Sequence, residues 1–141
     1  MNLADAETRL DVAECILNEC GTRTGEVVVY ELFCQNPYNG MGELYLAADE
    51  LDVSVPKMVH SDSVADERVP VYVGESVRPV ERLYEHCVKQ NNNVPFTALF
   101  PPDRIKALTW CEDKEEARRL EHERAQDIFQ NWRKPIVGGG K

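Results

Sequence analysis

The stretch DKEEARRLEHERAQDIFQNWRK, residues 113–134, is the clearest secondary-structure element of the sequence and predicts a long closing helix. Asp113 stands at its start, where a side-chain oxygen can accept hydrogen bonds from the first turn. Acidic residues fill that first turn and two basic residues fill the last, which is the arrangement that the helix dipole favours. Pro135 ends the helix, because proline cannot continue it.

Two short runs rich in apolar residues come before this helix and predict strands over residues 94–100 and 104–110, joined by a proline-rich turn at 101–104. Further upstream, residues 69–73 predict a strand that ends at Gly74, and Pro79 stands where the first turn of a helix accepts proline. The helix that follows has one apolar face and ends at three asparagines: Val80, Leu83, Tyr84, Cys87 and Val88 form the face, and Asn91, Asn92 and Asn93 the end.

In the first half of the chain, residues 3–20 predict an amphipathic helix that Gly21 ends, and residues 26–33 predict a strand. A turn at 36–40, with Asn39-Gly40 as a hairpin signal, precedes a second predicted strand at 43–47. Residues 53–59 predict a short strand and residues 61–67 a mobile loop. The apolar face of the predicted helix at residues 3–20 consists of Leu3, Ala6, Leu10, Ala13, Leu17 and Cys20, and Val12 and Ile16 widen it.

This order of elements predicts a single α+β domain over residues 1–135, with a flexible tail at 136–141. The sheet is mostly antiparallel, and the helices are an N-terminal helix, a middle helix and a long C-terminal helix. A chain of 141 residues is long enough to bury a core of its own without disulfides.

The expected location is the cytoplasm. No apolar run approaches the ~18 residues of a membrane span, so no membrane association is expected. The start of the chain is polar and acidic, unlike a secretory signal. The chain has five cysteines, an odd number, and their spacing is irregular. This predicts reduced thiols that pack as small core residues.

Acidic and basic residues are segregated along the chain. Residues 1–70 hold 14 acidic and 4 basic residues, a net charge of −10, whereas residues 71–141 hold 11 acidic and 12 basic residues, a net charge of +1. An excess of acid argues against nonspecific nucleic-acid binding, which needs a clustered basic surface. The asymmetry suits docking to a protein partner or to other copies of the chain, and so predicts a homo-oligomer.

No stretch carries a motif specific enough to name a reaction, and no metal site or cofactor is predicted. His86 and Cys87 are the one adjacent imidazole and thiol, but neighbours on a helix point about 100° apart, so we interpret them as a surface imidazole and a core thiol. The remaining histidines and acids lack the paired spacing of a zinc site and the glycine of a calcium loop.

The best candidate site is a pocket for a small anionic ligand, centred on Arg124, which interrupts the apolar stripe of the closing helix. Aromatic residues nearby would supply stacking surfaces. The alternative is that acids of the same helix pair with these arginines at helical spacing. The candidate residues are Arg124, Arg118, Arg119, Arg104, Asn92, Phe96 and Trp110.

Taken together, these features predict a small, acidic, non-catalytic binding protein: a regulator, an inhibitor or an accessory subunit that acts by protein contact. The alternative is a protein that binds or sequesters a small anionic ligand such as a nucleotide through its basic second half. A third possibility is an enzyme that depends on His86, Cys87 and Glu85.

Overall fold

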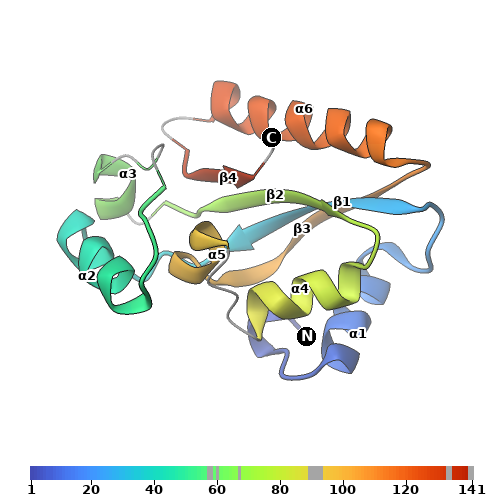
Figure 1. Ribbon diagram of the computed structural model, residues 1–141, viewed down its shortest axis with the longest axis horizontal. Helices are drawn as coiled ribbons and strands as arrows, with labels where there is room; N and C mark the ends of the chain where they lie inside the picture. The colour runs from blue at the N-terminus through green and yellow to red at the C-terminus, as the bar shows by residue number, and fades with distance from the viewer. Residues whose placement is uncertain (57–58, 60, 67, 89–93, 133–134, 140–141) are drawn as a thin grey trace.

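A computed structural model describes residues 1–56, 59, 61–66, 68–88, 94–132 and 135–139. Among these residues the chain forms one four-stranded mixed sheet with helices on both faces (Figure 1). The elements in chain order are the 3₁₀ helix η1 (Leu3–Asp5), α1 (Arg9–Cys20), β1 (Val27–Cys34), α2 (Met41–Leu51), α3 (Ser61–Ala65), β2 (Val71–Ser76), α4 (Pro79–Cys87), α5 (Pro95–Leu99), β3 (Pro102–Cys111), α6 (Lys114–Asn131) and β4 (Val137–Gly139).

The strand order in the sheet is β3-β1-β2-β4. Strand β1 pairs antiparallel with both β2 and β3, while β4 pairs parallel with β2. Helix α6 covers one face, and α1, α4 and α5 lie on the other (Figure 1). Because both faces are covered, β1 is buried on both sides and reads as a nearly continuous apolar run.

The structure confirms the predicted fold class, a single α+β domain with a mostly antiparallel sheet and a long C-terminal helix. The predicted strands at 26–33, 69–73 and 104–110 are β1, β2 and β3 within a few residues, and the middle helix begins at Pro79 as expected. Asp113 caps α6 by accepting a hydrogen bond from the backbone nitrogen of Glu116. All five cysteines are free thiols.

Two predicted strands are helices instead. Residues 43–47 lie in α2, where Leu44 and Ala48 are buried four positions apart while Tyr45 and Leu46 are exposed. Asn39-Gly40 therefore precedes a helix and does not form a hairpin. Residues 95–99 form α5, with Pro95 at the first helical position. Short apolar runs fit both the helical and the strand period, so sequence periodicity could not separate the two.

The ends of the chain also differ from the prediction. The first helix begins at Arg9, because Thr8 and Asp11 form a capping box. Its buried residues are Val12, Cys15 and Ile16, whereas Leu10 and Leu17 of the predicted apolar face are exposed. Residues 137–139, expected in a flexible tail, form β4. Residues 61–65, expected in a mobile loop, form α3, and residues 53–56 form no regular element. Asn91–Asn93 lie outside the described residues.

Glu31 is the one acid on the buried face of β1 under α6, with 2% of its surface exposed. Lys106 of β3 donates to its carboxylate, with Nζ 3.1 Å from Oε1, and Arg124 of α6 lies 3.5 Å from Oε2. A buried carboxylate is tolerated when it is paired in this way. Arg124 interrupts the apolar stripe of α6 because it reaches a carboxylate of its own chain.

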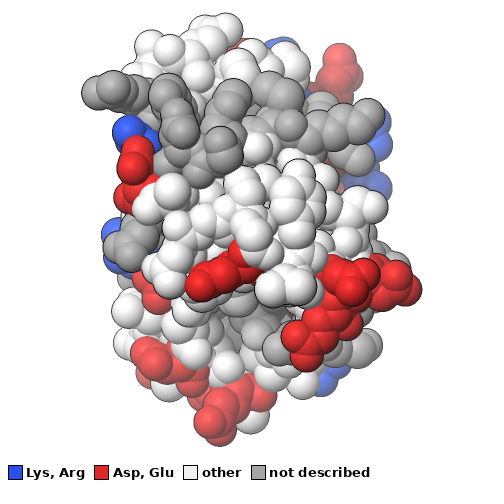
Figure 2. Space-filling view, turned by 90° about the vertical axis from the view of Figure 1, so that its left-hand side faces the viewer, with Lys and Arg blue, Asp and Glu red and all other residues white. Residues whose placement is uncertain are grey.

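The acids of residues 1–70 are divided between the segment 5–31 and the end of the molecule formed by α2 and α3 (Figure 1). Figure 2 faces this end, where acidic side chains predominate in the lower half of the view and few basic ones are visible. The exposed acids of α2 and its C-terminal residue are Glu43, Asp49, Glu50 and Asp52. No helix in the described part of the chain is both long and apolar enough to cross a membrane.

Candidate active site

A pocket of about 340 Å³ opens at the edge of β2, at the point where the short strand β4 stops. Strand β4 pairs with residues 71–73 of β2 and, among the described residues, with none of residues 74–76. Side chains from both faces of the sheet reach around this edge. We call it the β2-edge pocket. Its lining residues are Tyr30 from β1, Tyr72, Gly74 and Glu75 from β2, Arg82 from α4, Arg118 and Glu121 from α6, and Gly139 from β4.

Gly74 allows the phenol of Tyr30 to reach the pocket. The two residues are direct partners across the β1–β2 ladder. A Cβ atom added at Gly74 would collide with the hydroxyl and the ring of Tyr30. The position therefore requires glycine because of close approach, at an ordinary backbone conformation.

The hydroxyl of Tyr30 begins a buried chain of hydrogen bonds. It lies 3.0 Å from Nε2 of His86, and Nδ1 of His86 lies 2.8 Å from Oγ1 of Thr97. Since Thr97 donates its own proton to the carbonyl of Val94, at 3.4 Å, it accepts from Nδ1–H of His86. Nε2 then carries the lone pair and accepts the proton of Tyr30.

His86 is 3% exposed, so the predicted surface imidazole is wrong. The residue is tolerated in the core because both ring nitrogens have partners. Burial, together with the charge of Arg82, lowers the pKa of His86 to about 3. Cys87 is not its partner, and burial raises the pKa of the Cys87 thiol to about 12, which leaves it a poor nucleophile.

The two phenols of the pocket are also perturbed. Burial raises the pKa of Tyr30, although the hydrogen bond and charge of Arg82 act in the opposite direction. Burial raises the pKa of Tyr72 as well, and again Arg82 opposes the shift. Both hydroxyls are therefore protonated at neutral pH and lie within the field of the same guanidinium.

Two arginines and two carboxylates complete the pocket. Arg82 is bonded to Glu85 on its own helix, with 3.3 Å between NH1 and Oε2. Arg118 lies with Nε 3.6 Å from Oε1 of Glu75, whose other oxygen, Oε2, is buried without a hydrogen-bond partner. Guanidinium groups recognise phosphate oxygens, and carboxylates can hold a divalent cation. Together, these groups could bind a phosphate ester and a cation beside it.

The comparison with protein families gives a match in this region. Residues 63–131, just under half of the chain, match the family model of the GIY-YIG catalytic domain, a nuclease family. This segment contains β2, α4 and all of α6, and so every pocket residue except Tyr30 and Gly139. The searches of curated proteins and of solved structures gave no match.

The family name itself spells two tripeptides, Gly-Ile-Tyr and Tyr-Ile-Gly. Tyr72-Val73-Gly74 on β2 differs from the second by one methylene group, valine for isoleucine. Val28-Val29-Tyr30 on β1, which lies outside the matched residues, shares only the tyrosine of the first. The two segments lie on neighbouring antiparallel strands, with Tyr30 opposite Gly74.

This match contradicts the non-catalytic functions predicted from the sequence. A regulator, an inhibitor, an accessory subunit or a ligand-sequestering protein would not be expected to resemble a catalytic domain. The prediction that the protein does not bind nucleic acid nonspecifically is also contradicted, because GIY-YIG domains act on nucleic acids. Net charge failed as a guide because it sums over the whole surface, whereas catalysis depends on the charges of one pocket.

The structure does not bring the predicted ligand-binding residues together. Of the seven, Arg118 lines the β2-edge pocket and Arg124 is paired with Glu31. The others lie elsewhere: Arg119 is exposed on α6, Arg104 stacks over Phe33 on β3, Phe96 is buried in α5, Trp110 lines a second cavity, and Asn92 lies outside the described residues.

Proposed function

We propose that the protein is a nuclease that hydrolyses phosphodiester bonds in the β2-edge pocket. The observation that carries this proposal is the convergence of Tyr30, Tyr72, Arg82 and Glu121 in one pocket, within and beside the segment that matches a catalytic domain of nucleases. Three separate elements of the matched segment, β2, α4 and α6, contribute to it.

Arg82 and Arg118 bind the phosphate in this proposal. Their guanidinium groups offer paired donors that suit phosphate oxygens and stabilise the charge that develops on them during displacement. Arg82 is half-buried between α4 and the sheet, which holds its position. Arg118 is more exposed, and it must exchange its contact with Glu75 for the phosphate.

Tyr30 and His86 orient the attacking water and accept its proton. The water attacks phosphorus, and the proton of the water passes to the Tyr30 oxygen while the phenol's own proton passes to Nε2 of His86. The bond between phosphorus and the leaving oxygen breaks, and the leaving oxygen takes a proton from solvent. With a pKa of about 3, protonating His86 at pH 7 costs about 5 kcal/mol. The proton transfer through Tyr30 to His86 therefore occurs only in the transition state, and Tyr30 and His86 are both neutral in the resting protein.

The pocket also suits a magnesium ion. Mg²⁺ is commonly held by one or two carboxylates together with water and substrate phosphate. The carboxylate of Glu121 and the unpartnered Oε2 of Glu75 would hold it, and the ion would supply positive charge beside the phosphate. In the described residues no three histidine, cysteine or acidic side chains form a metal cluster, so a site that relies on the substrate for ligands is the one that fits.

Cleavage of labelled single-stranded and duplex DNA and RNA, with Mg²⁺ and with EDTA, tests the proposal. Arg82→Ala and Glu121→Gln should each lower kcat by about 10²–10³, the loss expected when one charge-stabilising group is removed. Arg104→Ala is the matched control, because it removes an arginine that lies over Phe33 outside the pocket. Equal activity of Arg82→Ala and wild type, or no cleavage of any substrate, would overturn the proposal.

A further inference from the structure

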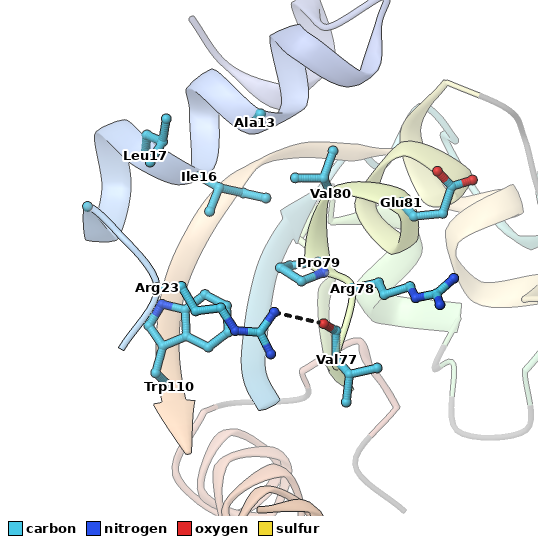
Figure 3. Close-up of a pocket in the computed structure, with 11 residues that line it drawn as sticks. Ala13, Ile16, Leu17, Arg23, Val77, Arg78, Pro79, Val80, Glu81 and Trp110 are labelled. Carbon is cyan, nitrogen blue, oxygen red and sulfur yellow. Dashed lines mark hydrogen bonds between the residues drawn. The ribbon is translucent and has the colours of Figure 1, made fainter. Parts of the chain in front are cut away.

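A cavity of about 490 Å³ is separate from the β2-edge pocket. It lies between α1, the start of α4 and Trp110 of β3 (Figure 3). Its walls are mainly apolar, from residues such as Ile16, Leu17 and Val80. Arg23 stands at its edge, so we call it the Arg23 pocket.

Arg23 presents a flat cation that the fold holds in place. Its guanidinium donates to three backbone carbonyls, those of Gly25 at 2.7 Å, Val77 at 3.2 Å and Glu26. One face of the group lies over the ring of Trp110, 5.0 Å from the ring centroid (Figure 3). The residue is exposed and lines the cavity, so part of the group is accessible from the cavity. An immobilised guanidinium backed by an indole is a preformed surface for stacking.

The charge at the edge of the pocket favours an anionic ligand with a planar apolar part. Glu81, the acid among its lining residues, already forms an ion pair with Arg9, with 2.6 Å between Nε and Oε2. Arg23 and Arg78 therefore leave an excess of positive charge. A nucleotide has this combination of properties, since its base stacks on flat side chains and its phosphate is drawn to arginine.

The Arg23 pocket adjoins the proposed active site along the chain. Val77 lines the first and Glu75 the second, so their Cα atoms are at most ~7 Å apart. On α4, Glu81 lines the Arg23 pocket and the next residue, Arg82, lines the β2-edge pocket. A strand held by its phosphate at Arg82 thus has its neighbouring nucleotide within reach of the Arg23 pocket.

We propose that the Arg23 pocket binds one unstacked nucleobase next to the phosphate that is cleaved. The base enters between the apolar wall of α1 and the accessible part of the Arg23 guanidinium, and the substrate is therefore a strand whose base is free to leave its stack. This inference rests on the proposed nuclease function, and it assigns the substrate class of that enzyme as single-stranded or locally unpaired nucleic acid.

A matched pair of variants tests the pocket. Leu17→Glu and Leu10→Glu each add one negative charge to an exposed leucine of α1, at 53% and 82% exposure, but only Leu17 lines the pocket. We expect Leu17→Glu to raise KM for a single-stranded oligonucleotide about 10-fold, the effect of one lost stacking contact, with kcat unchanged. Leu10→Glu should behave as wild type.

An oligonucleotide with an abasic nucleotide beside the cleavage position provides the second measurement. Wild type should lose about 10-fold in kcat/KM on this substrate, whereas Leu17→Glu should lose little more than it has already lost. In a Trp132→Phe background, the intact oligonucleotide should quench Trp110 fluorescence and the abasic one should not.

Equal rates on intact and abasic strands, with identical KM for the two leucine variants, would overturn the base-binding proposal and leave the nuclease function standing. The same result is expected if the pocket instead receives an apolar side chain of a protein partner. If no nucleic acid is cleaved under any condition, the proposed function itself fails, and the base-binding proposal fails with it.

Discussion

Removing both cations that face Glu31 should destabilise the fold far more than the two single removals predict. Glu31 is 2% exposed, Lys106 contacts one of its carboxylate oxygens and Arg124 the other. Either cation alone still compensates the buried charge. With both absent, the carboxylate under α6 has no ion-pair partner and must stay buried as an unpaired charge or take up a proton.

The geometry sets the magnitudes. The Arg124 side chain is 41% exposed and its contact is 3.5 Å, so we expect Arg124→Met to cost about 1 kcal/mol of the free energy of unfolding. The Lys106 side chain is 24% exposed with a contact of 3.1 Å, so Lys106→Met should cost about 1–2 kcal/mol. The double variant should cost about 3–5 kcal/mol, the usual result of stranding a buried charge.

Urea unfolding followed by circular dichroism measures all three costs, with Lys114→Met as a control that removes an exposed lysine at the start of α6. Adding Glu31→Leu to the double variant should recover most of the loss, because it removes the stranded carboxylate. A double variant whose cost equals the sum of the single costs would show that Glu31 is not held by the two cations jointly, and would refute this reasoning.

Three further predictions concern the pocket. Gly74→Ala should abolish cleavage, because its methyl group displaces the Tyr30 phenol, while Gly42→Ala, where nothing lies within 4 Å, should keep activity. Because the pKa of His86 is lowered in the folded state, His86 of the unfolded chain takes up a proton at a higher pH than His86 of the folded chain. The free energy of unfolding should therefore fall by about 3 kcal/mol between pH 7 and pH 4. His86→Gln should lack this part of the loss in unfolding titrations. Few arginines face the phosphates, so the binding constant for duplex DNA should depend only weakly on salt. A plot of its logarithm against the logarithm of salt concentration should have a slope of about −2, and a slope near −8 would contradict this.

The elements that the sequence predicted correctly are those with a strong local signal. The strand β1 is a continuous apolar run, α4 begins at Pro79, and α6 has Asp113 as its cap. The strand β4, which the sequence did not predict, depends on tertiary contacts. Strand β4 consists of Val137 and two glycines, and it forms only by pairing with β2, more than sixty residues away in the chain.

The residues of the candidate active site were missed because they resemble core residues. Tyr30 and Tyr72 each follow a valine on a strand, where aromatic residues are common. His86 follows the apolar pattern of α4 poorly and was therefore placed on the surface, although Tyr30 and Thr97 satisfy both its nitrogens in the core. The signal that remained was the glycine after Tyr72-Val73: a glycine within a strand often marks a place where another group approaches closely.

The distribution of charge explains how an acidic chain can carry a site for nucleic acid. Part of the acid lies on α2 and around it, in the segment that separates the tyrosine of β1 from the tyrosine of β2, and this end of the molecule lies away from the β2–α4 connection (Figure 1). Nucleic acid approaching that end is repelled, whereas the other side presents Arg82 and Arg118, with Arg23 and Arg78 next to them. With few phosphate contacts available, the affinity of the proposed nuclease must come from what lies beside the scissile bond. A preformed stacking surface in the adjoining cavity would therefore matter more for this chain than for a basic one.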